Sequence, residues 1–100
     1  MPANLTVIYW RDIPAQVNAT SGRTSAKAQL DERFQQAIDA AAMKAGLADA
    51  EDYLEQWRQE TRPCSEALQR EVAAEAERLE TEYTPEVLSA LTETGGLRSG

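Results

Sequence analysis

The longest apolar run of the chain, Val7 to Trp10, lies near its start within a mostly apolar stretch over residues 5–10. The sequence of this stretch, Leu-Thr-Val-Ile-Tyr-Trp, is rich in β-branched and aromatic side chains and predicts a β-strand. Apolar residues fall on both faces of this strand, so it is either covered on both sides or has a second face that binds a partner. The run ends at Asp12, Ile13 and Pro14, because proline lacks a backbone donor and fixes its own φ angle.

A second strand is predicted over residues 15–20, where apolar and polar side chains alternate. The odd-numbered residues are apolar and the even-numbered ones are polar, which is typical of a half-exposed strand. The two strands most simply form a β-hairpin. A hairpin alone is marginally stable in water, so it must pack on helices or add another strand.

A long helix is predicted after the turn at residues 21–23, because apolar residues then recur at helical spacing. Thr24 or Ser25 caps this helix, which runs to about Ala45 and ends at Gly46. Its apolar stripe consists of Leu30, Phe34, Ala37, Ile38, Ala41 and Ala45.

The next segment predicts a shorter helix that begins at Asp49. The apolar side of this helix consists of Tyr53, Leu54 and Trp57. Residues 58–62 then alternate charged and uncharged side chains, a pattern that is compatible with a polar edge strand.

Two more helices are predicted in the last third of the chain. Ser65 caps the first, whose apolar residues repeat every three or four positions: Leu68, Val72, Ala76, Leu79 and Tyr83. Such a regular seam suits packing against one neighbouring element. Thr84 and Pro85 open the last helix, and Gly95-Gly96 ends it.

Together these elements indicate an α+β fold, a small antiparallel β-hairpin or three-stranded sheet packed against three to four α-helices. A chain of 100 residues makes a single domain, which we place at residues 1–96, with residues 97–100 as a flexible C-terminal tail. The core is thin, since 17 of the hydrophobic residues are alanine. We therefore expect modest stability or stabilisation by a partner.

Composition excludes several kinds of chemistry. The chain has no histidine and one cysteine, Cys64, which removes Ser-His-Asp and Cys-His nucleophiles and zinc sites of the Cys/His kind. We assign no catalytic residue, no metal and no cofactor. The apolar run near the start is too short for a signal peptide or a membrane span, so a cytoplasmic location is expected.

Charge is unevenly distributed along the chain. Residues 1–46 carry five basic and four acidic side chains, and residues 47–100 carry five basic and thirteen acidic ones, for a net charge of −7. This balance opposes binding to nucleic acid or to an anionic membrane. A basic or neutral protein partner, or a homo-oligomer, is easier to accommodate.

The hairpin supplies a candidate partner-binding site made of Tyr9, Trp10, Arg11, Asp12 and Pro14. Tryptophan, tyrosine and arginine dominate the energetics of protein interfaces. The alternative is that Tyr9 and Trp10 are core residues on opposite faces of the strand, with Arg11 at a solvated strand end.

Arg23, Ser25 and Lys27 form a candidate anion site at the predicted helix N-terminus, where free backbone N–H groups favour negative charge. Plain helix capping with solvated cations is the alternative. The carboxylates of the second half, for example Glu75 near Arg78, are interpreted as a solvated helix face rather than a metal or acid-base site.

Three stretches carry a likeness to a known family: VIYWRDIPAQV, GRTSAKAQLDERFQQAIDAAAMKAG and DAEDYLEQWR. They resemble the bacterial virulence factor domain, over about residues 5–92 and in its single-domain form. Members of this kind lie in some bacteria beside genes for corrinoid-dependent methyltransferases and methylenetetrahydrofolate reductase. The resemblance implies an accessory role in one-carbon metabolism and transfers no functional residue.

The leading hypothesis is a noncatalytic accessory or protein-interaction module that presents the hairpin and the Arg23/Lys27 loop to a larger protein. The alternative is a small ligand-binding protein or subunit in folate- or corrinoid-dependent methyl transfer. In that case Arg11, Arg23 and Lys27 would hold an anionic group.

Overall fold

The computed structural model describes residues 2–47 and 50–97. In chain order its elements are β1 (Ala3–Trp10), β2 (Ile13–Ser21), β3 (Thr24–Gln29), α1 (Glu32–Lys44), α2 (Ala50–Leu54), β4 (Trp57–Cys64), α3 (Leu68–Glu82) and α4 (Pro85–Glu93). The α+β class is confirmed. Asp49, the predicted start of the second helix, and residues 98–100 of the predicted tail lie outside the described residues.

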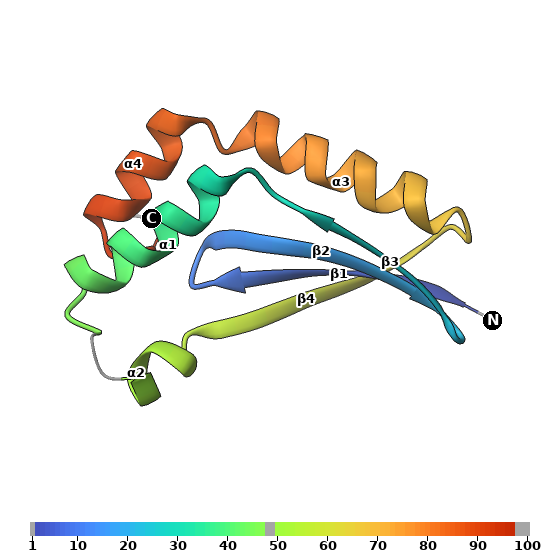
Figure 1. Ribbon diagram of the computed structural model, residues 1–100, viewed down its shortest axis with the longest axis horizontal. Helices are drawn as coiled ribbons and strands as arrows, with labels where there is room; N and C mark the ends of the chain where they lie inside the picture. The colour runs from blue at the N-terminus through green and yellow to red at the C-terminus, as the bar shows by residue number, and fades with distance from the viewer. Residues whose placement is uncertain (1, 48–49, 98–100) are drawn as a thin grey trace.

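The four strands form one antiparallel sheet in the order β3-β2-β1-β4. Helix α3 packs across β2 and β3, and α1 packs against β2 and α4. Figure 1 shows α3 and α4 following each other along one side of the molecule, while α2 lies beside the start of β4. Among the described residues, none of the helices combines the length and the apolar character needed to cross a bilayer.

The core lies between α3, α1 and one face of the sheet. On β1 this face carries Leu5, Val7 and Tyr9, because alternate residues of a strand point to the same side. Leu5 and Val7 pair with Ala19 and Val17 of β2, which are also buried. The helices add the buried side chains of Phe34, Ile38, Val72, Leu79, Leu88 and Leu91.

A β-bulge shifts the register between β1 and β2. Ile8 pairs with Gln16 but Tyr9 pairs with Pro14, so Ala15 is the extra residue on β2. An irregularity of the ladder is a place where a strand tolerates proline, which has no N–H to donate.

The prediction of a helix from Thr24 onward is wrong for its first third. Thr24–Gln29 is strand β3, joined to β2 by a tight turn in which Gly22 has a φ of 59°. Pairing with β2 outweighs the weak local helix preference of this segment. The α1 helix begins at Glu32, and the Asp31 side chain caps it by accepting the Arg33 N–H at 3.3 Å.

The polar edge strand left open at residues 58–62 is confirmed as the centre of β4. Ser65 is not the cap of α3, whose N-cap is Ala67. Instead the Ser65 hydroxyl, two positions before this N-cap, accepts the Ala67 N–H at 3.3 Å. The predicted Thr84 cap is confirmed, because its hydroxyl accepts the Val87 N–H at 3.2 Å.

Trp10 is fully buried, so it is a core residue, as the second interpretation of the hairpin proposed. Its indole N–H donates to the Tyr53 carbonyl at 3.0 Å, and its ring stacks on that of Tyr53 with centroids 5.5 Å apart. A further contact comes from the segment after α4, where Gly96 has a φ of 90°. A Cβ atom at Gly96 would lie 2.8 Å from Cζ3 of Trp10.

We expect Gly96→Ala to destabilise the protein far more than Gly46→Ala. Both glycines have positive φ, but a Cβ at Gly46 would meet nothing within 4 Å. Gly46→Ala should lower the free energy of unfolding by about 1 kcal/mol from backbone strain alone. Gly96→Ala adds overlap with the indole and should cost about 3 kcal/mol. Urea unfolding of the two variants measures the difference, and equal losses would contradict this packing of Trp10.

Candidate functional site

The structure separates the five hairpin residues proposed for partner binding. Tyr9, Trp10 and Pro14 are buried, whereas Arg11 and Asp12 keep part of their surface exposed. The Arg11 guanidinium donates to the side-chain oxygen of Gln56 and to the Gly95 carbonyl, both at 3.0 Å. Arg11 therefore ties the β1–β2 turn to two distant segments of the chain.

The three residues proposed for anion binding do not lie at a helix N-terminus. Arg23 is in the β2–β3 turn, and Ser25 and Lys27 are in β3, so the structural premise of that site is wrong. Arg11 and Arg23 lie beyond opposite ends of β2, a strand of nine residues that spans about 30 Å. One anionic group cannot contact both arginines.

The face of the sheet that points away from α3 carries mostly uncharged polar side chains, and we call it the open face. Strand alternation and the pairing register place these residues on it: Thr6, Ile8, Gln16, Asn18, Ser25, Lys27, Gln29, Gln59 and Thr61. Lys27 is the single charged residue of this set, although 27% of the chain is charged.

Hydrogen bonds order part of the open face. The hydroxyls of Thr6 and Thr61 lie 3.0 Å apart and connect β1 to β4. The amide nitrogen of Gln16 donates to the side-chain oxygen of Asn18 at 2.8 Å along β2. These hydrogen bonds therefore partly fix the positions of four side chains on the open face.

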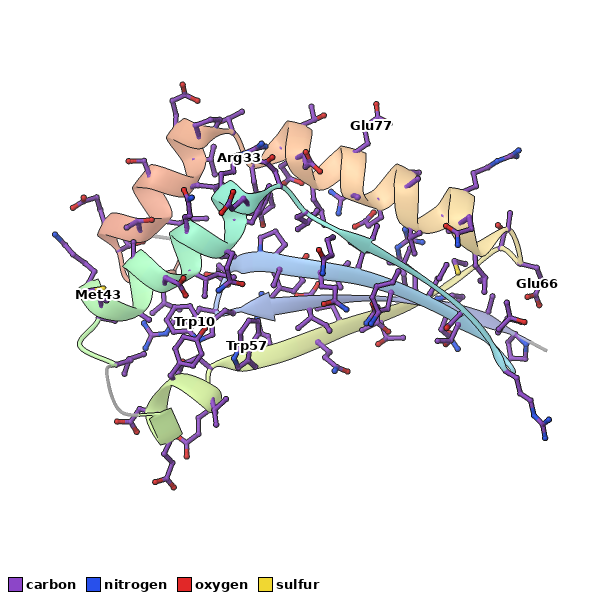
Figure 2. The ribbon with its side chains drawn as sticks, in the orientation of Figure 1. Trp10, Arg33, Met43, Trp57, Glu66 and Glu77 are labelled. Atoms are coloured by element: carbon purple, nitrogen blue, oxygen red, sulfur yellow. The ribbon has the colours of Figure 1, made fainter. Side chains whose placement is uncertain are left out.

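One end of the open face is hollowed. The hollow has a volume of about 620 Å³ and is lined by Ile8, Ala15, Gln16, Gln29, Leu30, Asp31, Glu32, Phe34, Gln35 and Trp57. Trp57 pairs with Trp10 across β4 and β1, and both lie near α2 in Figure 2. The Trp57 ring meets the Tyr53 ring edge to face, with centroids 6.0 Å apart. Sequence reasoning missed this site because it read residues 24–29 as helix.

A second cluster lies on the opposite face of the sheet, between β4 and α3. Glu75 of α3 is only 6% exposed and accepts two hydrogen bonds from Arg78, at 2.6 and 3.0 Å. Arg62 of β4 donates to the same carboxylate at 3.4 Å. The hydrogen bonds from Arg78 are the main reason that the pKa of Glu75 lies below its usual value.

Burial of Glu75 corrects the interpretation of this carboxylate as part of a solvated face. The sequence did hold the signal, because Glu75 follows Val72 by three positions and precedes Leu79 by four. That spacing places all three on one side of a helix.

Tyr9 belongs to the same cluster. Burial raises the pKa of Tyr9 to about 12, and the negative charge of Glu60 is the second cause. The Arg58 guanidinium lies over the Tyr9 ring, 4.4 Å from its centroid. Tyr9 is therefore a neutral phenol at physiological pH.

In the ranges that the structure describes, no three His, Cys, Asp or Glu residues are grouped to hold a metal ion. Burial, followed by the charge of Glu71, raises the pKa of the Cys64 thiol, which disfavours the reactive thiolate.

Comparison with known proteins gives a match to a protein family. A family model described as Virulence factor matches residues 8–92, which include every residue that lines the hollow. No curated protein and no solved structure matches the chain.

We expect the stabilising effect of Glu75 to depend on pH. Its lowered pKa means that the folded state favours the carboxylate, so this stability is present above the usual glutamate pKa and is lost as the pH falls through the lowered value. Glu75→Gln should cost about 2 kcal/mol at pH 7 and less at pH 3, because it removes charged hydrogen bonds. Urea unfolding at both pH values measures the change.

Glu77→Gln is the matched control for this prediction. Glu77 lies two positions along the same helix but is exposed and points away from the sheet (Figure 2). Its substitution should change stability by less than about 0.5 kcal/mol at either pH. An equal loss for Glu75→Gln at pH 3 and pH 7 would show that the charge of Glu75 is not what stabilises the fold.

Proposed function

The chain belongs to the Virulence factor family, and we propose that it is a noncatalytic protein-interaction module that docks a partner protein on its open face. The observation that carries this proposal is the near absence of charge on that face. Charged residues are depleted at the centres of protein interfaces, because their desolvation is costly.

The chemistry of the open face suits a protein partner. Its amide and hydroxyl groups both donate and accept hydrogen bonds, so backbone and side-chain groups of a partner can satisfy them. Ile8 and Trp57 add apolar surface at the hollowed end. The ordered pairs of Thr6 with Thr61 and Gln16 with Asn18 lower the entropy lost on binding.

Charge on the rest of the molecule limits which partners fit. Most of the net charge of −7 comes from the second half of the chain, which includes α3 and α4. A basic or neutral protein can approach this surface, whereas an acidic one is repelled. Ser25 and Lys27, first considered for anion binding, belong to the proposed docking face.

The geometry favours this module over a subunit of folate- or corrinoid-dependent methyl transfer. That alternative depends on Arg11, Arg23 and Lys27 holding one anionic group, and the first two lie beyond opposite ends of β2. An accessory role in one-carbon metabolism is compatible with the module, and the identity of its partner would test it.

The proposal predicts that charge introduced at the centre of the open face abolishes partner binding, because the new carboxylates would lose their water without gaining a partner charge. The test variant is the double substitution Asn18→Asp with Gln59→Glu, on β2 and β4. Tagged protein is purified from its native cells with whatever binds stoichiometrically, and mass spectrometry identifies the bound chain. The variant should lose that chain while keeping its circular dichroism spectrum and melting temperature.

The matched control is Gln36→Glu with Gln69→Glu, which adds the same charge at exposed positions of α1 and α3. This control should retain the partner. A partner bound equally by the test and control variants would place the docking surface elsewhere. Loss of the partner from both would show a dependence on overall charge rather than on the open face.

A further inference from the structure

We propose that the hollow beside Trp57 receives an arginine side chain from the docked partner. This inference rests on the proposed function and specifies what the open face recognises. The occupant is an exposed segment of another protein that carries one arginine, and the docking position is the end of the open face where β3 leads into α1.

The shape of the hollow is set by three parts of the fold. Its sheet side is formed by Ile8, Gln16 and the bulge residue Ala15, and β4 contributes Trp57. The remaining wall is the start of α1 and the link that precedes it. Pockets that bind small molecules have volumes of about 300–1,000 Å³. At about 620 Å³ the hollow therefore takes an arginine side chain together with the backbone on either side of it.

The charges in the hollow favour a cation. Asp31 and Glu32 contribute two carboxylates, and none of the lining residues is basic. Asp31 pairs with Arg33 at 3.4 Å, yet its side chain remains 54% exposed. Glu32 is also exposed, and among the described residues no ion pair involves it.

The remaining lining groups favour a guanidinium over an ammonium ion. A planar guanidinium stacks on an aromatic ring, and Trp57 presents one whose orientation is held by its edge contact with Tyr53. The five N–H donors of arginine also match several separated acceptors, here two carboxylates and the side-chain oxygens of Gln16, Gln29 and Gln35. An ammonium group offers three donors and no flat surface.

The test uses N-acetyl-arginine methylamide as the probe and the intact protein at 0.15 M salt. In a ¹H–¹⁵N NMR spectrum the indole signals of Trp10 and Trp57 are distinguished with Trp57→Phe. Titration should move the Trp57 indole signal in a saturable way and leave that of buried Trp10 unchanged. The neutral analogue N-acetyl-citrulline methylamide should bind about tenfold more weakly, since it lacks the charge that the carboxylates and the ring attract.

The test variant is Asp31→Asn with Glu32→Gln, which keeps a side chain at residue 31 that can cap α1. This variant should bind the arginine probe about five- to tenfold more weakly, because two exposed charge interactions are removed. The matched control is Glu86→Gln, which removes a carboxylate from the first turn of α4. This control should leave the affinity unchanged.

Several results would overturn the assignment: no saturable shift at Trp57, equal binding of the citrulline analogue, tighter binding of N-acetyl-lysine methylamide, or no effect of the test variant. A Trp57 signal that moves with protein concentration before any probe is added would assign the hollow to a second copy of the chain. These outcomes are independent of partner capture. If the Asn18→Asp with Gln59→Glu variant loses the partner but the arginine probe does not bind the protein, the open face remains the docking surface. Only the proposed specificity for arginine is then wrong.

Discussion

Burial of Trp10 connects the parts of this fold that are most distant in sequence. The indole lies at the end of β1, stacks on Tyr53 of α2 and lies against Gly96 beyond α4. Arg11 adds hydrogen bonds from the same turn to Gln56 and Gly95. A small domain with many alanines has few large side chains to exclude water, so one fully buried tryptophan makes a large contribution to its stability.

The same arrangement determines which surface is free. Because α1, α3 and α4 are packed against one another or against one face of the sheet, the other face keeps its polar side chains in solvent except near α2. There the Tyr53 ring contacts the ring of Trp57, which lines the hollow. The aromatic contacts that close the core at this end of the sheet thus also shape the surface proposed to bind a partner.

Most of the fold could be predicted from local pattern, and the exceptions have physical causes. The strands at residues 5–10 and 15–20 and the seam of α3 follow from alternation and helical spacing, which reflect burial directly. Strand β3 could not be recognised, because Thr24–Gln29 has no large apolar side chain to mark a strand and becomes one only by pairing with β2. The hollow forms only when β3 pairs with β2, so the hollow could not be predicted from the sequence either. The spacing of Glu75 along its helix did indicate that this side chain is buried. An exposed side chain was predicted instead, because glutamate is almost never fully buried.

The position of β4 at the edge of the sheet has a consequence for the order of folding. Strands β1, β2 and β3 are joined by short turns and can pair locally, whereas β4 pairs with β1 only after the chain has passed through α1 and α2. Closing that long loop costs entropy before the ladder forms. Helix α3 packs on β2 and β3, so β4 is held by β1, by the Arg62–Glu75 bridge and by the bonds of Arg58 to Asp12 and to the Arg11 carbonyl. It should join the native structure last and open first. Since Trp57 belongs to β4, the hollow exists only while the sheet is complete, and the recognition proposed at this end of the molecule would report that the chain has finished folding.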